Sequence, residues 1–160
     1  MNQNCFGKAG SMVKILFICY GNICRSPMAE FIMKDLVKKS GTEVQFYIES
    51  AATSREEIGN PVYPLARRKL AEHHIDCAGK TARQLRKEDY SRFDFLIGMD
   101  RGNLRDMQRI CGGDPMGKIH LLMDFTDHPG DVADPWYTRD FETTWNDIVA
   151  GCQGFLKRNL

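Results

Sequence analysis

Short apolar runs alternate with segments of helical spacing along most of the chain. Residues 13–19 (VKILFIC) form a nearly continuous apolar run, which is typical of a strand buried on both faces of a parallel sheet. Three further runs predict strands at 44–48, 93–99 and 118–123.

Apolar residues recur at helical spacing between and after these runs. The period predicts a helix from Pro27 to Lys39 that closes at Ser40-Gly41, a helix over 61–74, a short helix through Leu104 and Met107, and a C-terminal helix over 141–156. Strands separated by helices predict right-handed crossovers, and hence a small doubly wound α/β fold. We expect a parallel four-stranded sheet in the flavodoxin-like order 2-1-3-4, with helices on both faces and ligands beyond the carboxyl ends of the strands.

Composition narrows the possible classes of protein. The chain has 160 residues, of which 42% are hydrophobic and 27% charged, and its net charge is +1. That near-neutral balance argues against nucleic acid or an anionic membrane as the main partner. The apolar run from Ile15 to Tyr20 is far too short to span a bilayer. We interpret residues 1–12 as a leader without signal-peptide character, outside a single domain over 13–160.

Six cysteines without a CxxC pair or a Cys/His ligand cluster predict neither a disulfide scaffold nor a metal site. A reducing, cytoplasmic setting is therefore the expected location, although export without a signal peptide stays open.

The chemistry is concentrated after the first strand, in the segment Cys19-Tyr20-Gly21-Asn22-Ile23-Cys24-Arg25-Ser26-Pro27. A loop of this length between a strand and a helix can turn its successive N–H groups toward one anion. Gly21 would permit a positive φ, Asn22 tolerates left-handed geometry too, and Ser26 and Pro27 suit the N-cap and first position of the helix.

Within such a loop Cys19 is expected to be a thiolate of lowered pKa, because the helix N-terminus, the N–H groups and Arg25 all favour the anion. Arg25 offers a planar fork that matches two phosphate oxygens. The alternative is a buried structural cysteine followed by a surface arginine. The position between a buried strand and a helix, with glycine, asparagine and Ser-Pro in register, favours the functional interpretation.

With these residues the sequence resembles the low-molecular-weight protein tyrosine phosphatase family. The resemblance runs from about Val13 to the last helix and rests on CYGNICRSPMAE at 19–30, Ser50-Ala51-Ala52-Thr53, Ala82-Arg83-Gln84, Phe93-Asp94, Met99-Asp100 and Asp134-Pro135-Trp136-Tyr137. It implies metal-free and cofactor-free hydrolysis of phosphotyrosine and aryl phosphates through a phosphocysteine on Cys19. Arg25 and the loop hold the phosphoryl oxygens, and Asp134 acts first as general acid and then as general base.

The same resemblance implies roles for further residues. Ser26 donates to the Cys19 sulfur, and Asn22 and Ser50 fix the loop. Cys24 forms a reversible disulfide with Cys19. The phosphate-binding residues that it implies are Tyr20, Gly21, Asn22, Ile23, Cys24, Arg25 and Ser26. The residues that it implies for the substrate pocket are Tyr20, Glu56, Trp136 and Tyr137. The partners implied are a phosphotyrosine-containing protein or peptide as substrate and inorganic phosphate as product. The protein itself is expected to be a monomer.

Two positions depart from the family pattern. Glu56-Glu57 stand in a variable loop that often carries an aromatic residue, which favours a target with a cationic flank. Lys80 stands where many relatives have a histidine, so any tuning role of that histidine is expected to be absent.

Three other functions compete with this one. A protein-arginine phosphatase tends to carry Thr where this chain has Ile23. A thioredoxin-coupled arsenate reductase needs two closely spaced relay thiols, whereas Cys77 and Cys111 are far apart in sequence. A phosphate-binding module without turnover is expected to lack the acid, Asp134.

Overall fold

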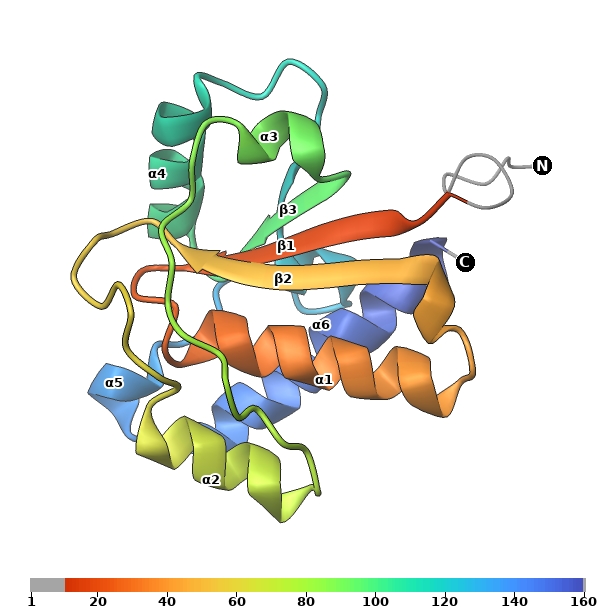
Figure 1. Cartoon of the computed structure of the whole chain (residues 1–160), viewed down its shortest axis with the longest axis vertical. Coiled ribbons are helices and arrows are strands. Elements are labelled where there is room, and N and C mark those ends of the chain that lie inside the picture. Colours follow the sequence, from red (N-terminus) through yellow and green to blue (C-terminus); the bar gives the residue numbers. More distant parts are fainter. Residues whose placement is uncertain (1–10, 160) are drawn as a thin grey trace.

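The apolar run that opens the pattern forms a central strand of a parallel sheet (Figure 1). The computed structural model describes residues 11–159, and within them the four strands pair in the order β2-β1-β3-β4, which confirms the predicted order. These strands are β1 (Val13–Cys19), β2 (Phe46–Ala52), β3 (Phe95–Gly98) and β4 (Ile119–Leu121). Every residue of β1 except Lys14 is buried, because the sheet is covered on both faces.

Helices cover the two faces as a doubly wound fold requires (Figure 1). The helices are α1 (Arg25–Lys39), α2 (Pro64–Glu72), α3 (Asp89–Arg92), α4 (Arg101–Cys111), α5 (Pro135–Thr138) and α6 (Phe141–Asn159). Side chains of β1 alternate between two buried clusters, with Ile15 and Phe17 facing α1 and α6, and Leu16 and Ile18 facing α4. Helix α2 packs on the outer side of α1 and α6.

Helix α6 lies unusually close to the segment that leads from β4 toward Asp134. A Cβ on Gly151 would stand 2.4 Å from Leu122 Cγ, and one on Gly154 would stand 2.0 Å from the Phe125 carbonyl oxygen. The contacted residues belong to a 3₁₀ turn, Leu122–Phe125. A second 3₁₀ turn, Glu43–Gln45, lies elsewhere, before β2, and the one that α6 contacts is Leu122–Phe125. The two glycines therefore let α6 hold this turn firmly, which fixes the start of the long loop that carries Asp134.

Several element boundaries differ from the sequence prediction. The second strand begins at Phe46 rather than at 44, because Val44 is 78% exposed in a 3₁₀ turn, and it continues through Ala52 beside β1. The helix expected over 61–74 begins at Pro64, because Pro61 is bridged to Thr81.

A short helix of mostly polar residues precedes the third strand, and the apolar periodicity did not predict it. Asp89–Arg92 is a short helix, and Phe93 caps it, so that β3 begins only at Phe95. The fourth strand is also shorter than expected, since its last predicted residues form the 3₁₀ turn.

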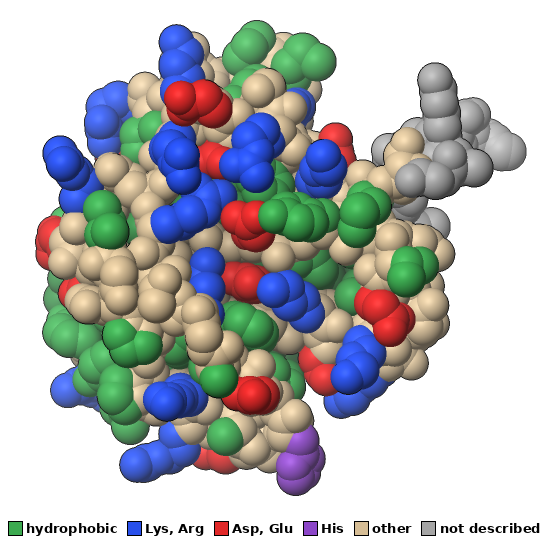
Figure 2. Space-filling view, viewed as in Figure 1, with side chains coloured by type: hydrophobic (Ala, Val, Ile, Leu, Met, Phe, Trp, Pro, Cys, Tyr) green, Lys and Arg blue, Asp and Glu red, His purple; other side chains and the backbone are tan. Residues whose placement is uncertain are grey.

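The surface in Figure 2 carries basic and acidic side chains side by side. Arg83 pairs with Glu49 and Asp89, and Arg92 pairs with Asp89. No helix among residues 11–159 is long and apolar enough to cross a membrane. The leader expected at residues 1–12 lies almost entirely outside the described residues.

Candidate active site

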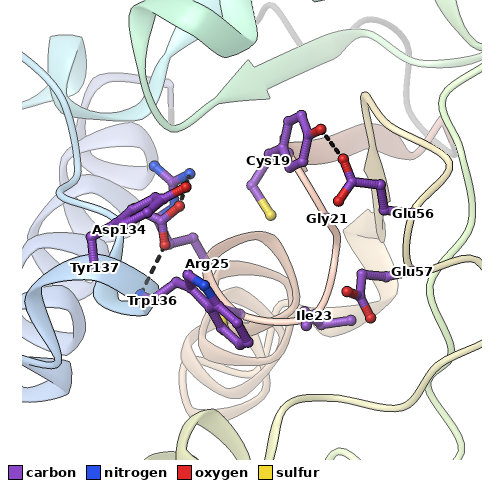
Figure 3. Close-up of a pocket in the computed structure, with 11 residues that line it drawn as sticks. Cys19, Gly21, Ile23, Arg25, Glu56, Glu57, Asp134, Trp136 and Tyr137 are labelled. Carbon is purple, nitrogen blue, oxygen red and sulfur yellow. Dashed lines mark hydrogen bonds and ion pairs between the residues drawn. The ribbon is translucent and has the colours of Figure 1, made fainter.

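Three loops meet at the carboxyl edge of the sheet, where the fold places ligands. The loop after β1 carries Cys19 and Arg25, the turn after β3 carries Asp100, and the segment before α5 carries Asp134. The amide of Val132 donates to the carbonyl of Met99, which ties the Asp134 segment to the end of β3. Figure 3 shows the Cys19 sulfur, the Arg25 guanidinium and the Asp134 carboxylate around one pocket.

The loop from Cys19 to Arg25 makes its sharpest turn at Asn22, which has a φ of 59°. Gly21 lies outside the left-handed region, so of the two residues that could take a positive φ, Asn22 is the one that does. Asparagine tolerates this conformation because its amide can form local hydrogen bonds, and here those bonds are made to buried groups.

Helix α1 begins two residues earlier than the sequence predicted. Cys24 occupies the N-cap position, without a side-chain cap, and Arg25 is the first helical residue. Ser26 therefore lies in the first turn and is not the N-cap. Its hydroxyl turns to the Cys19 sulfur instead of capping the helix.

Three hydrogen-bonding groups surround the sulfur of Cys19. Ser26 Oγ lies 3.0 Å from it, the backbone N–H of Asn22 donates over 3.3 Å, and that of Ser26 over 3.4 Å. Donors at these positions stabilise a thiolate more than a thiol. Within the described residues, the amides of Ile23, Cys24 and Arg25 donate to no protein acceptor. They are available to an anion above the sulfur.

Arg25 is anchored along one side of its buried guanidinium. Nη1 donates to Asp100 Oδ2 over 2.8 Å and to the Val132 carbonyl over 2.9 Å, and Nη2 lies 3.3 Å from Asp134 Oδ2. Burial by itself lowers the pKa of Arg25, but Cys19, Asp100 and Asp134 outweigh burial and raise it. Among residues 11–159, no acceptor bonds Nε. The edge formed by Nε and Nη2 therefore remains for two oxygens of a phosphoryl group.

Asp134 projects toward this edge from extended backbone, as expected of a residue before proline. Its Oδ1 accepts from the Trp136 amide over 3.0 Å, while Oδ2 faces Arg25. The carboxylate is partly exposed, so that a leaving group and a water molecule can reach it.

The pocket walls come from the residues that the resemblance implied and from Glu57. Trp136 and Tyr137 lie on the side of the Asp134 segment, and Glu56 and Glu57 lie opposite (Figure 3). Tyr20 also lines the pocket and is exposed. Tyr20 donates to Glu56, and this bond raises the pKa of Tyr20. The pocket thus combines an anion site at its base with aromatic walls and an acidic margin.

Cys24 lines the same pocket but has a different environment. Burial, followed by the neighbouring charges of Cys19 and Asp134, raises the pKa of Cys24 to about 12. Cys24 is therefore a neutral thiol at neutral pH. Of the two cysteines in the loop, only Cys19 has the donors that a nucleophilic thiolate needs.

Three residues in or next to the site were missed as functional groups. Asp100 anchors Arg25, and its position after a parallel strand is the signal that could have found it. Glu30 accepts from Ser50 and pairs with Lys80, which from sequence was considered only as the residue that replaces a histidine. Within residues 11–159, no three His, Cys, Asp or Glu side chains are grouped as a metal site.

A thiol that accepts hydrogen bonds from backbone amides at the start of a helix, with a buried guanidinium and a carboxylate on the same pocket, is an arrangement typical of cysteine-dependent phosphohydrolases. The comparisons specify the family. The family model "Low molecular weight phosphotyrosine protein phosphatase" matches residues 14–159. The chain belongs to this family of hydrolases.

Individual relatives agree along nearly the whole chain. A low molecular weight phosphotyrosine protein phosphatase of Gallus gallus is 39% identical over 155 residues, covering 94% of this chain and 98% of the relative. The crystal structure of YfkJ from Bacillus subtilis superposes with a TM-score of 0.91 at 37% identity, covering 94% of this chain and 96% of that one. A Drosophila arginine phosphatase structure, at 28% identity, has a TM-score of 0.85 and covers 91% of this chain and 97% of its own.

Proposed function

We propose that this protein hydrolyses phosphotyrosine and other aryl phosphate monoesters through a phosphocysteine intermediate on Cys19. The observation that carries the proposal concerns the Cys19 sulfur. It accepts hydrogen bonds from the same short loop that supplies Arg25 and three amides without an acceptor among the described residues. Nucleophile and phosphate cradle are thus held at one place, and the free edge of Arg25 faces it.

In the first step the phosphoryl oxygens accept hydrogen bonds from the loop amides and from Nε and Nη2 of Arg25. Arg25 then shares its charge with the dianion, so its hold on Asp134 weakens, and the dianion favours a protonated Asp134. The Cys19 thiolate attacks phosphorus and forms the P–S bond while the P–O bond to the phenol breaks. Asp134 gives its proton to the departing phenolic oxygen.

In the second step Asp134, now a carboxylate, takes a proton from a water molecule that attacks phosphorus. A new P–O bond forms, the P–S bond breaks and inorganic phosphate leaves. The departing thiolate is received by Ser26 Oγ and by the Asn22 and Ser26 amides. The residues of the chain supply every proton transfer, so the proposal invokes no metal or cofactor.

The aromatic walls favour a phenol as leaving group. Tyr20 and Trp136 flank a slot above the anion site, and a phosphoserine side chain is too short to place its phosphorus at Cys19 while the peptide stays at the rim. Ile23 adds apolar lining to the same slot. We therefore infer a phosphotyrosine-containing protein or peptide as the substrate.

An arsenate reductase is disfavoured by the positions of the spare thiols. Cys77 is buried in the cluster that includes α1, whereas Cys111 is buried in the cluster on the other face of the sheet. A relay needs two thiols that can bond to each other and to the nucleophile. The sheet separates these two.

Cys24 is proposed as the redox partner of Cys19. A peroxide oxidises the Cys19 thiolate to a sulfenic acid, and attack by the Cys24 sulfur closes a disulfide with loss of water. Burial raises the pKa of Cys24 to about 12, so this attack is slow at neutral pH. Because the nucleophile must stay reduced, we propose that the protein acts in the cytoplasm. We further propose that it acts as a monomer.

A substrate panel tests the function. Wild-type protein is assayed with phosphotyrosine, phosphoserine and phosphoarginine peptides, and with arsenate plus thioredoxin. We expect turnover of phosphotyrosine well above the others, and its loss in Cys19→Ser. Cys111→Ser is the matched control, because it changes a buried cysteine on the far face of the sheet. Preference for phosphoarginine, or turnover that survives Cys19→Ser, contradicts the proposal.

A further inference from the structure

A chain of buried polar side chains runs from the Cys19 sulfur to the interior of α1. Asn22 Nδ2 donates to Ser26 Oγ over 2.8 Å and to Ser50 Oγ over 2.9 Å. Ser50 Oγ in turn donates to Glu30 Oε1 over 2.6 Å. All four of these side chains are at least 95% buried, so water does not supply alternative partners.

We propose that Glu30, held by Lys80, is a positioning residue that fixes the direction of hydrogen bonding along this chain so that Ser26 donates its proton to Cys19. The inference rests on the proposed function, in which Cys19 attacks and leaves as a thiolate. It adds two residues, on α1 and on the segment before α3, to the groups that prepare the nucleophile.

Counting donors and acceptors fixes the orientation of Asn22. Its Oδ1 accepts from the backbone N–H of Arg83 over 3.2 Å, and a backbone N–H can only donate. Asn22 Nδ2 therefore faces the two serines, and both of its protons are used. Each serine accepts from Asn22 and must send its own proton elsewhere.

The acceptors available to the two serine protons differ. Ser50 sends its proton to Glu30, which as a carboxylate can only accept. Ser26 has Cys19 Sγ at 3.0 Å and the more distant Ala51 carbonyl at 3.4 Å. The sulfur is the nearer and, as a thiolate, the more strongly charged acceptor.

Lys80 and Lys34 hold the buried Glu30 side chain in place. Lys80 Nζ lies 3.3 Å from Glu30 Oε1 and donates to the Ser50 carbonyl over 2.9 Å, so one ammonium holds both ends of the Ser50–Glu30 contact. Lys34 Nζ, half exposed, holds the other oxygen of Glu30 at 2.6 Å. Burial lowers the pKa of Lys80, and Glu30 opposes that shift.

Without an acceptor at position 30 a second arrangement competes. If the Asn22 amide turns over, Oδ1 accepts from both serines, which satisfies Ser50 but costs the bond from Arg83. Ser26 then donates to Asn22, and the sulfur loses its nearest donor. Glu30 thus opposes this arrangement by accepting the Ser50 proton.

The test is the pH profile of Cys19 alkylation by iodoacetamide, with the modified residue located by mass spectrometry. The main variant is Glu30→Met with Lys80→Met, which removes the acceptor without leaving a buried cation unpaired or changing the net charge. We expect the midpoint of the profile to move up by about one pH unit, equal to a 10-fold loss of thiolate, and kcat to fall about 10-fold. Glu30→Gln, which keeps an acceptor for Ser50, should restore most of the wild-type profile.

Two comparisons separate this role from general stability. In a Ser26→Ala background the double change should cause no further shift, since the donor it acts through is absent. Lys39→Met, which removes a surface ion pair on the same helix, should leave the profile unchanged.

An unchanged or downward midpoint in the folded double variant overturns the proposal, as does an additive shift in the Ser26→Ala background. Alkylation requires no phosphate substrate. A wild-type protein without phosphatase activity therefore contradicts the proposed function, whereas an unchanged profile contradicts this inference alone.

Discussion

Two strand-to-helix junctions lie at the same edge of the sheet, and they differ in how the first amides of the helix are capped. After β3, Asp100 caps α4: its Oδ1 accepts from the Asn103 amide over 2.8 Å, and the Asn103 side chain accepts from the Asp100 amide in return. The first amide of α4, that of Arg101, donates to Asp131 over 3.1 Å. After β1, the N-cap residue of α1, Cys24, makes no side-chain cap.

The difference explains why only one junction forms an anion site. The first amides of a helix need acceptors, and at α4 two of them, those of Arg101 and Asn103, already donate to carboxylates of the protein. At α1 the Ser26 amide meets the Cys19 sulfur, and the amides of Ile23, Cys24 and Arg25 have no acceptor among the described residues. The oxygens of a bound phosphoryl group would accept hydrogen bonds from these free amides and so cap the helix.

Exchange of the guanidinium should produce the largest effect. Arg25→Lys keeps a positive charge but removes the planar fork, so we expect kcat/KM for an aryl phosphate to fall about 10³-fold. Arg101→Lys is the matched control, because Arg101 is the first residue of the other helix and its side chain is exposed. Comparable losses in the two variants would mean that the α1 junction has no special role.

Removal of the acid should follow in size. Asp134→Asn retains an acceptor for the Trp136 amide but has no proton to donate, so turnover of phosphotyrosine should fall about 10²-fold or more. For an aryl phosphate whose phenolate leaves without a proton, the loss in the first step should be much smaller. Equal losses on both substrates would remove Asp134 from the acid role.

Asp100 belongs to both junctions, and two substitutions separate its contributions. Asp100→Asn keeps a good N-cap for α4 but weakens the hold on Arg25, so kcat/KM should fall about 10-fold with little change in stability. Asn103→Ala breaks the capping box without touching Arg25, and should lower the free energy of unfolding by about 1–2 kcal/mol.

Thermal unfolding and steady-state kinetics of the same two variants check this separation. If Asn103→Ala reduced activity more than Asp100→Asn did, the link from Asp100 to Arg25 would not matter for catalysis.

The acidic margin should give the smallest effect. Glu56→Gln with Glu57→Gln removes two exposed or half-exposed charges beside the anion site. We expect KM for a phosphotyrosine peptide with flanking lysines to rise about three-fold, and the rise to vanish at high salt. A peptide with neutral flanks serves as the comparison. A salt-independent change, or one equal for both peptides, would rule out charge selection here.

The residues that could be predicted from sequence are those that lie close together in it. Cys19 and Arg25 bracket a turn between a buried strand and a helix, so their meeting follows from local geometry. The strand order followed from alternation of strands and helices, and the structure confirms it. Asp134 lies far along the chain, and its place in the site was implied only by the family resemblance.

The groups that sequence could not supply depend on tertiary packing. Glu30 is one of many polar residues on α1 in sequence, and it acquires a role only because β2 brings Ser50 beside it. Lys80 and Asp100 reach their partners across segments that no periodicity relates. The positive φ at Asn22 rather than at Gly21 depends on buried partners from β2 and from the Arg83 amide.

The central claim is that the uncapped junction holds a phosphoryl group against Cys19, and rapid acid quench of a single turnover tests it most directly. With labelled aryl phosphate, we predict that label appears on the peptide containing Cys19 before phosphate is released, and that it is absent in Cys19→Ser. Hydrolysis without any protein-bound label, or label on Cys24, would contradict the account.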